Sequence, residues 1–201
     1  MLDRWTVQLL RKPLNRVAER LKSFGCSPDQ ISFAAFGLGM GALPALYLNM
    51  YWLALICILL NRVGDGLDGA LARMTKASDA GGFLDIVLDF IFYSSVVLGF
   101  AMADPVANGL AAAVLLFTFV GTGSSFLAFA IMAEKRGIEN ITYPQKGIYY
   151  LSGLAEGTET LVCFVLFCIF PVHFPMLAYV FATICLVTML TRVIGGYFAL
   201  R

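Results

Sequence analysis

The sequence predicts an all-α integral membrane protein: a bundle of six transmembrane helices, preceded by an N-terminal amphipathic helix in the membrane interface. Of the 201 residues, 60% are hydrophobic and only 13% are charged, whereas a soluble domain carries roughly 25% charged residues. Apolar runs near the ~20 residues that span a bilayer core recur along the chain. We expect one domain over 1–201, with 1–26 as the interfacial helix and lead-in and 27–201 as the bundle.

The N-terminal segment 3–24 alternates apolar and basic residues at helical spacing. Trp5 and Leu9 are among its apolar residues, and Arg11 and Lys12 are among its basic residues. Such a helix suits a membrane interface, because its basic side can face anionic headgroups. An ordinary solvated helix is the alternative. A new helix is then expected near residue 28, because Ser27 can act as N-cap and Pro28 as the first helical residue.

Six apolar runs follow, each near the length of a membrane span. They are Ile31–Met50, Trp52–Arg73, Gly82–Ala103, Val106–Met132, Ile148–Phe170 and Pro175–Leu200. The second run is unusual, because its last third carries Arg62, Asp65 and Asp68.

The basic residues predict the orientation of the bundle. With the N-terminus in the cytoplasm, the cytoplasmic regions are the N-terminal helix, the connections 74–81 and 133–147 and the C-terminal end. The fourteen Lys and Arg residues lie in or near these regions, and the opposite connections, around Tyr51, 104–105 and 171–175, contain none. This is the positive-inside pattern. We therefore expect the N-terminus and the polar residues 65–89 to lie on the cytoplasmic side of the membrane.

Four carboxylates interrupt this apolar sequence: Asp65, Asp68, Asp85 and Asp89. An ionised side chain at mid-bilayer costs roughly 2.5–3.5 kcal/mol, so four without compensation would cost about 10–14 kcal/mol. Spacings of three and four residues place each pair on one helix face. Such carboxylates repel one another unless cations are bound. Oxygen ligands at this density predict Mg²⁺ or Mn²⁺, with two ions expected.

The residues after Asp68 predict a diphosphate site next to these acids. Gly69 and Ala72 have almost no side chain, so a ligand can lie against the helix there. Arg73 supplies a planar cation with several donors, which suits phosphate oxygens. A structural cluster of ion pairs between two helices is the alternative interpretation.

The run Asp65-x-x-Asp68-Gly69-x-x-Ala72-Arg73, followed by Gly81-x-x-x-Asp85-x-x-x-Asp89, resembles the signature of the CDP-alcohol phosphatidyltransferase family. One spacing departs from it: seven residues separate Arg73 from Gly81, where eight or so is commoner. The six-helix layout and the chain length are also similar to that family.

The resemblance implies a metal-dependent enzyme of phospholipid biosynthesis in a bacterial inner membrane, active as a homodimer. It would transfer a substituted phosphate group from a CDP-linked donor, expected to be CDP-diacylglycerol, to the hydroxyl of a small polar alcohol, and release CMP. Asp65, Asp68 and Asp85 would bind the metals, and Asp89 would bind the second ion or act as general base. The CDP part would be held by Asp65, Asp68, Gly69, Ala72 and Arg73.

The acceptor alcohol is less clear from the sequence. Arg192 and Lys146 could bind a phosphorylated alcohol, because a membrane arginine requires an anionic partner. Glu156 and Glu159, three residues apart in the fifth apolar run, could instead hold hydroxyls or an amine, or neutralise Arg192. These possibilities stay open.

Two other functions fit parts of the same pattern. The donor could be a CDP-linked small alcohol, with diacylglycerol as acceptor. A divalent-cation or proton-coupled transporter could also use membrane carboxylates, although such carriers usually show internal repeats or broken helices at mid-membrane. Membrane lipids are expected partners, and nucleic acid is not.

Overall fold

The computed structural model describes residues 3–75, 77–137 and 153–201, which form helices and contain no strand. The all-α prediction is confirmed for this part of the chain. The helices are α1 (Asp3–Ser23), α2 (Pro28–Met40), α3 (Ala42–Tyr47), α4 (Tyr51–Met74), α5 (Asp79–Ala103), α6 (Pro105–Lys135), α7 (Gly157–Ile169), the short 3₁₀ helix η1 (Pro171–His173) and α8 (Phe174–Leu200).

Within the described residues, four segments are long and apolar enough to cross a membrane: Pro28–Tyr47, Asp79–Ala103, Pro105–Lys135 and Pro171–Leu200. Helix α4 has 24 residues but includes the charged motif, and α7 has only 13 residues. Six spans therefore remain a prediction. The structure has a helix where the N-terminal interfacial helix is expected, and its location in an interface also remains a prediction.

The predicted helix start at Ser27 is confirmed. The Ser27 hydroxyl accepts a hydrogen bond from the backbone N–H of Gln30 (3.2 Å), and the Gln30 side chain accepts one from the Ser27 N–H (3.0 Å). This reciprocal capping box satisfies two N–H groups that a helix start otherwise leaves unpaired. Pro28 stands at the first helical position, where its missing N–H has no cost.

Two predicted helices differ from the structure. The run Ile31–Met50 forms α2 and α3, with a break at Gly41. Pro44 explains the break, because it has no N–H to donate to the carbonyl of Met40.

In the run Ile148–Phe170, helix α7 begins at Gly157; residues 148–152 lie outside the described residues. Residues 153–156 are not helical. The N–H groups of Leu154 and Ala155 instead donate to the Thr188 hydroxyl of α8 (3.1 and 3.0 Å).

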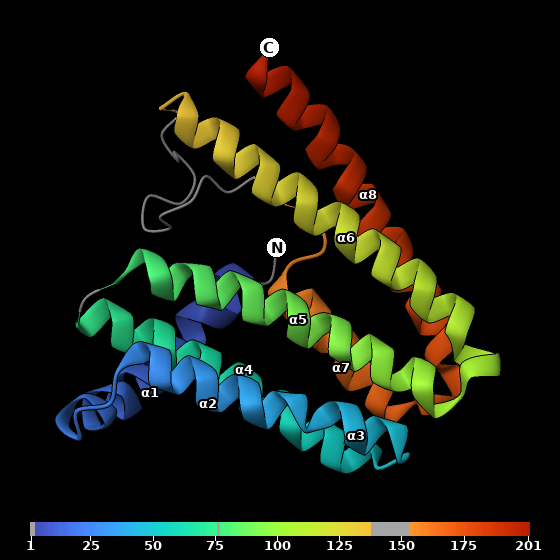
Figure 1. The fold of residues 1–201 in the computed structure, drawn as a ribbon, viewed down its shortest axis with the longest axis horizontal. Coiled ribbons are helices and arrows are strands. Elements are labelled where there is room, and N and C mark those ends of the chain that lie inside the picture. The colour runs from blue at the N-terminus through green and yellow to red at the C-terminus, as the bar shows by residue number, and fades with distance from the viewer. Residues whose placement is uncertain (1–2, 76, 138–152) are drawn as a thin grey trace.

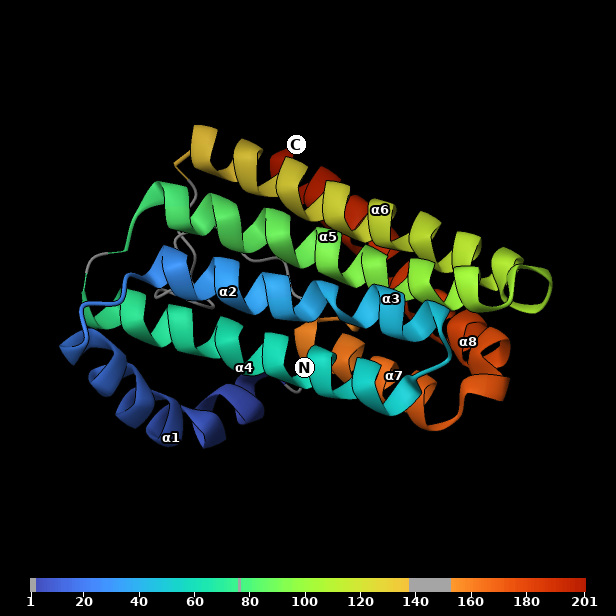
Figure 2. The same cartoon turned by 60° about the horizontal axis from the view of Figure 1, so that its bottom comes forward.

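Helix α2 packs against both α4 and α5, the two helices that carry the acidic motif (labelled in Figure 1), and lies between them in the view of Figure 2. Helix α5 also packs against α6, and α6 against α8. Helix α1 lies obliquely against α4 (Figure 2). Lys22 there donates a hydrogen bond to the carbonyl of Met74, the last residue of α4 (2.8 Å). These contacts fix the end of α4 that carries the motif.

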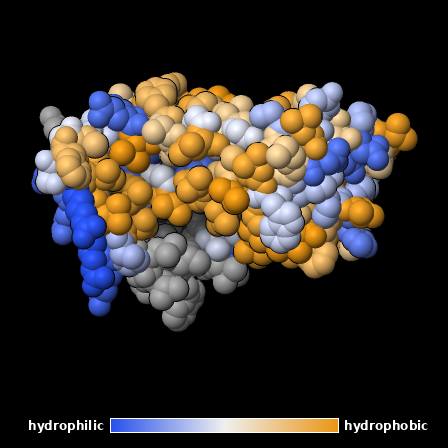
Figure 3. Space-filling model, turned by 90° about the horizontal axis from the view of Figure 1, so that it is seen from below, coloured by the Kyte–Doolittle hydropathy of each residue, from blue (hydrophilic) through white to orange (hydrophobic). Residues whose placement is uncertain are grey.

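Buried phenylalanines join α5, α7 and α8 at the far end of the bundle. Phe100 stacks on Phe174 with ring centroids 4.5 Å apart, and Phe167 meets Phe100 edge to face at 5.8 Å. Large hydrophobic side chains also remain exposed along most helices. Hydrophobic side chains cover much of the face in Figure 3, and the most hydrophilic patches lie toward its two ends. An apolar surface of this extent fits a lipid environment.

Candidate functional site

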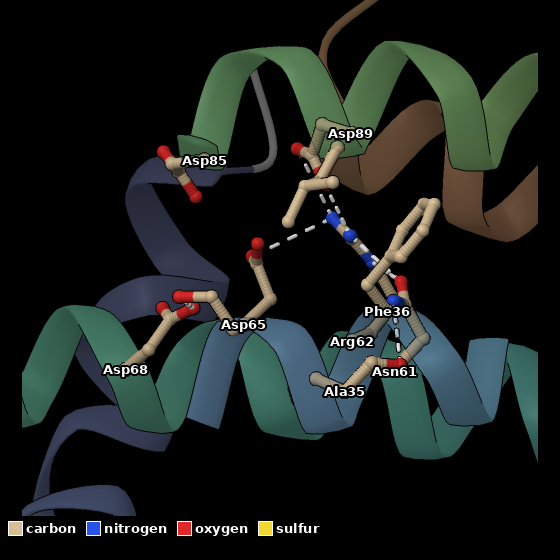
Figure 4. Close-up of a pocket in the computed structure, with 10 residues that line it drawn as sticks. Ala35, Phe36, Asn61, Arg62, Asp65, Asp68, Asp85 and Asp89 are labelled. Carbon is tan, nitrogen blue, oxygen red and sulfur yellow. Dashed lines mark hydrogen bonds and ion pairs between the residues drawn. The ribbon is translucent and has the colours of Figure 1, made fainter. Parts of the chain in front are cut away.

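Three of the four predicted carboxylates come together between α4 and α5. One carboxylate oxygen from each of Asp65, Asp68 and Asp85 lies within 4.8 Å of the others. Figure 4 shows Asp65 and Asp68 on α4 facing Asp85 on α5. Asp68 is buried, at 7% exposure, while Asp85 is exposed. The prediction that spacing turns these acids toward one point is thus correct for three of them.

The fourth carboxylate, Asp89, is bound by an arginine. The Arg62 guanidinium forms an ion pair with Asp89 Oδ1, and its Nη1 lies 3.4 Å from Asp89 Oδ2 and 3.5 Å from Asp65 Oδ2. In Figure 4, Arg62 reaches from α4 across the pocket to Asp89 on α5. Asp89 therefore lines the same pocket as the other three acids, but with a cation of the chain beside it.

Several groups hold the Arg62 side chain in place. Its Nε and Nη2 donate to Asn61 Oδ1 (3.0 and 2.8 Å), and Nη1 donates to the Tyr93 hydroxyl (3.0 Å). The guanidinium carbon also lies 5.3 and 5.2 Å from the ring centroids of Phe92 and Tyr93, within cation–π range. The side chain is only 14% exposed. Arg62 is thus a fixed, partly desolvated cation.

Helix α2 forms the third side of the site. Ser32 donates a hydrogen bond to Asp68 Oδ2, and Asn61 donates to the Ala35 carbonyl (3.1 Å). A Cβ atom on Gly39 would lie 2.7 Å from Asn61 Nδ2. The close approach of α2 to α4 thus depends on that glycine. The complete pocket is lined by Ser32, Ala35, Phe36, Asn61, Arg62, Asp65, Asp68, Asp85, Leu88 and Asp89.

Gly69, Ala72 and Arg73 occupy the last two turns of α4, directly after the buried Asp68. A Cβ on Gly69 would meet only Arg73 Nη1, at 3.4 Å, which is ordinary van der Waals contact. The fold itself therefore does not require a glycine there. Arg73 is exposed. A small-residue surface beside an arginine and three carboxylates is suited to a ligand that carries phosphates.

The predicted acceptor residues lie on other elements. Arg192 of α8 is 8% exposed; its Nη1 donates to the Thr122 carbonyl of α6 (3.3 Å), and its guanidinium carbon lies 5.5 Å from the Phe126 ring centroid. Neither contact involves α2, α4 or α5, the three helices that line the carboxylate pocket. Lys146 lies outside the described residues.

Glu156 does not share a helix face with Glu159, because it precedes the first residue of α7. It is 8% exposed and accepts a hydrogen bond from the Gly153 N–H (3.3 Å). Glu159 stands in the first turn of α7 and lines an apolar pocket with Cys163 and Phe181.

Three polar residues at the carboxylate site were not identified from the sequence, and a fourth was left without a role; Ser32 and Asn61 line the pocket, whereas Tyr93 lies behind it. Ser32, Asn61 and Tyr93 contact the acids or their arginine, and Arg62 is noticeable in the sequence only as a charge inside an apolar run. Polar side chains inside predicted spans are the signal that could have identified Ser32 and Asn61. Tyr93 offers no comparable signal.

The oxygen atoms of the three carboxylates are suited to bind a hard divalent cation. Three carboxylates from two helices supply oxygen ligands alone, with no sulfur or imidazole among them, and this is the chemistry that Mg²⁺ and Mn²⁺ favour. The Ser32 hydroxyl also donates a hydrogen bond to the Asp68 carboxylate. Such bonds orient metal ligands in proteins.

Comparisons with known proteins agree with this geometry. The family model of the CDP-alcohol phosphatidyltransferases matches residues 26–194. The inner membrane protein YnjF of Escherichia coli is 50% identical over 201 residues, which is 100% of this chain and 98% of that protein. An archaetidylinositol phosphate synthase of Pyrococcus horikoshii is 37% identical over 94 residues, 46% of this chain and 50% of that one.

Solved structures share the fold. The phosphatidylinositol phosphate synthase of Mycobacterium tuberculosis with CDP-DAG bound superposes with a TM-score of 0.73 at 20% identity, over 92% of this chain and 93% of that one. The same synthase with manganese and citrate gives a TM-score of 0.72, over 92% and 88%. The family model covers most of the chain, and YnjF resembles it over the whole length. The chain therefore belongs to the CDP-alcohol phosphatidyltransferase family and is an enzyme of phospholipid biosynthesis.

Proposed function

We propose that this enzyme transfers the phosphatidyl group of CDP-diacylglycerol to the hydroxyl of a small polar alcohol and releases CMP, with Mg²⁺ or Mn²⁺ bound by its carboxylates. The observation that carries the proposal is the cluster of Asp65, Asp68 and Asp85, whose oxygens lie within 4.8 Å of one another. Gly69 and Arg73, on the next turns of α4, form an open surface for a diphosphate.

Each motif residue has a role in this proposal. Asp65, Asp68 and Asp85 would hold the first cation, and Asp89 would contribute to a second. A bound divalent ion supplies Lewis-acid stabilisation of charge on a transferring phosphate. The CDP part would lie over Gly69 and Ala72, with Arg73 donating hydrogen bonds to its phosphate oxygens, while Asp65 and Asp68 also contact it.

Asp89 would accept the proton in the transfer step. The acceptor hydroxyl oxygen forms a bond to the phosphorus next to the lipid, and the bond from that phosphorus to the CMP oxygen breaks. The hydroxyl proton passes to the Asp89 carboxylate, and CMP leaves. A carboxylate is a weak base, but it only has to accept the proton as the attack proceeds.

Similar proteins support the choice of donor. One structural neighbour is a phosphatidylinositol phosphate synthase with CDP-DAG bound, and one relative in sequence is an archaetidylinositol phosphate synthase. For the acceptor, the buried Arg192 favours a phosphorylated alcohol, since a buried guanidinium suits an anionic ligand. Glu156, Glu159 and Lys146 remain candidates for contacts to the rest of the acceptor. The reverse arrangement, with a CDP-linked small alcohol as donor and diacylglycerol as acceptor, uses the same motif.

We further propose that the motif faces the cytoplasm, where a water-soluble nucleotide has access, and that the enzyme is a homodimer. The absence of basic residues from the connections around Tyr51, 104–105 and 171–175 supports this orientation. Labelling of single cysteines placed in the opposite connections, in intact and permeabilised cells, tests it.

An acceptor screen on the purified protein tests the reaction. Labelled CDP-diacylglycerol is supplied with Mg²⁺ or Mn²⁺, and CMP release is followed with glycerol 3-phosphate, serine, inositol, inositol phosphate and ethanolamine. We expect metal-dependent CMP release with one acceptor, above all a phosphorylated one. A parallel assay with diacylglycerol and CDP-linked alcohols identifies the reverse arrangement. The donor proposal is wrong if neither assay releases CMP and no CDP-linked donor binds.

A further inference from the structure

The pocket contains a cation of the chain itself. Arg62 lies between Asp89 and Asp65, is 14% exposed, and contacts Asn61 and Tyr93 through separate guanidinium nitrogens. Both oxygens of Asp89 face this guanidinium, because Nη2 pairs with Oδ1 and Nη1 lies 3.4 Å from Oδ2. Asp89 is therefore not a free ligand in this arrangement.

We propose that Arg62 positions Asp89 and competes with the second divalent ion for it. The inference rests on the proposed metal site and specifies its loading. The first ion binds to Asp65, Asp68 and Asp85, where three oxygens are already close together. A second ion needs Asp89, and must either displace the guanidinium or bind beside it. Arg62 thus makes the second site weaker than the first.

Charge and geometry both support competition. A guanidinium and a divalent ion on one carboxylate repel each other, and this repulsion is strong in a site partly shielded from water. The planar group also occupies two directions around the Asp89 carboxylate, as bidentate pairing does. Asn61 and the Phe92 and Tyr93 rings hold it there. The guanidinium therefore repels the second ion because of its charge and position, whatever it also contributes to the stability of the fold.

The same contacts give Arg62 a role when one ion is bound. It keeps the Asp89 side chain directed into the pocket, on the side of Asp65 (Figure 4). Arg62 itself is a positioning residue, since in the proposal it acts through Asp89.

Titration of Mn²⁺ into the purified protein, with calorimetry and the EPR signal of free Mn²⁺ as readouts, tests the inference without any turnover. For the unaltered chain we expect one tight ion and a second that binds at least about tenfold more weakly. In Arg62→Gln the second ion should bind at least about tenfold more tightly than in the unaltered chain, because its competitor is gone. In Arg62→Lys the charge remains and the second site should stay weak.

Two further variants complete the design. Arg136→Gln removes an exposed arginine at the end of α6 and should leave both affinities unchanged. Asp89→Asn should abolish the weak second site and keep the first, which keeps the test usable even if Arg62→Gln does not fold.

The outcomes separate the two proposals. Competition is wrong if the second affinity is the same in Arg62→Gln and the unaltered chain, or if Arg62→Lys behaves like Arg62→Gln. It is also wrong if Asp89→Asn retains both ions. A chain that binds no Mn²⁺ at all contradicts the metal site of the proposed function, and the inference with it.

Discussion

The Ser32 hydroxyl in α2 donates a hydrogen bond to Oδ2 of Asp68 in α4. Asp68 is the most buried of the four acids, at 7% exposure, so this bond orients a carboxylate that has little contact with water. Helix α2 thus acts on the acidic cluster directly, although its sequence carries no part of the family motif.

Replacing Ser32 should therefore weaken cation binding. In Ser32→Ala, Asp68 loses the bond that orients it, and loss of such a bond typically lowers metal affinity about 10–100-fold. Mn²⁺ titration measures the change. Ser124→Ala is the matched control, because within the described part of the chain the Ser124 hydroxyl bonds only to the carbonyl of Gly121 in its own helix. Equal Mn²⁺ affinity in the Ser32 and Ser124 variants would show that the bond is not needed.

Asp89→Asn should abolish turnover and leave binding of the CDP-linked donor measurable. The amide keeps the size of the side chain but cannot accept the proton, and loss of a general base costs about 10²–10⁴-fold in rate. CMP release and donor affinity are measured on the same preparation. Asp79→Asn, in the exposed first turn of the same helix, should retain activity. Full activity in Asp89→Asn would exclude the base assignment.

The sequence predicts the motif helices well because their signals are local. The helically spaced acids of α4 and α5, like the capping Ser27 and the first-turn Pro28 of α2, each depend on a few neighbouring residues. Helices α4 and α5 accordingly begin and end within a few residues of Trp52–Arg73 and Gly82–Ala103. The three carboxylates of the cluster were identifiable for the same reason.

Contacts between distant segments were not predictable in this way. Spacing places Asp89 on the face of Asp85, but does not reveal that Arg62, 27 residues earlier, pairs with it. The start of α7 at Gly157 depends on the Thr188 hydroxyl, more than 30 residues later, which takes the N–H groups of Leu154 and Ala155. In both cases a partner far along the chain decides the local structure.

Gly69→Val should reduce donor binding without loss of folding. Because a Cβ there meets, among the described residues, only Nη1 of Arg73, we expect the fold to accept the added methyl groups, which would fill space that the ligand needs. Overpacking of about 1–3 kcal/mol corresponds to a donor affinity lower by about 5- to 150-fold. Gly82→Val is the control, since Gly82 is exposed with nothing within 4 Å of its added Cβ. Equal donor affinity in both variants would remove Gly69 from the CDP site.

Gly39→Ala should destabilise the protein, and Gly37→Ala should not. A Cβ on Gly39 would lie 2.7 Å from Nδ2 and 2.8 Å from Cβ of Asn61, whereas one on Gly37 would meet nothing within 4 Å. We expect a loss of about 1–3 kcal/mol for Gly39→Ala, against a small gain for Gly37→Ala, because alanine favours helix by up to about 1 kcal/mol.

Thermal unfolding of the two variants in the same detergent measures the difference. Asn61 also accepts hydrogen bonds from Arg62 (3.0 and 2.8 Å). A displaced Asn61 should therefore also shift Arg62 in the pocket. In Gly39→Ala the second Mn²⁺ should consequently bind more tightly, as in Arg62→Gln, while Gly37→Ala keeps the unaltered affinities. Equal unfolding temperatures for the two variants would mean that α2 can move away from Asn61 without cost. The close α2–α4 contact would then not be what holds Arg62 against Asp89.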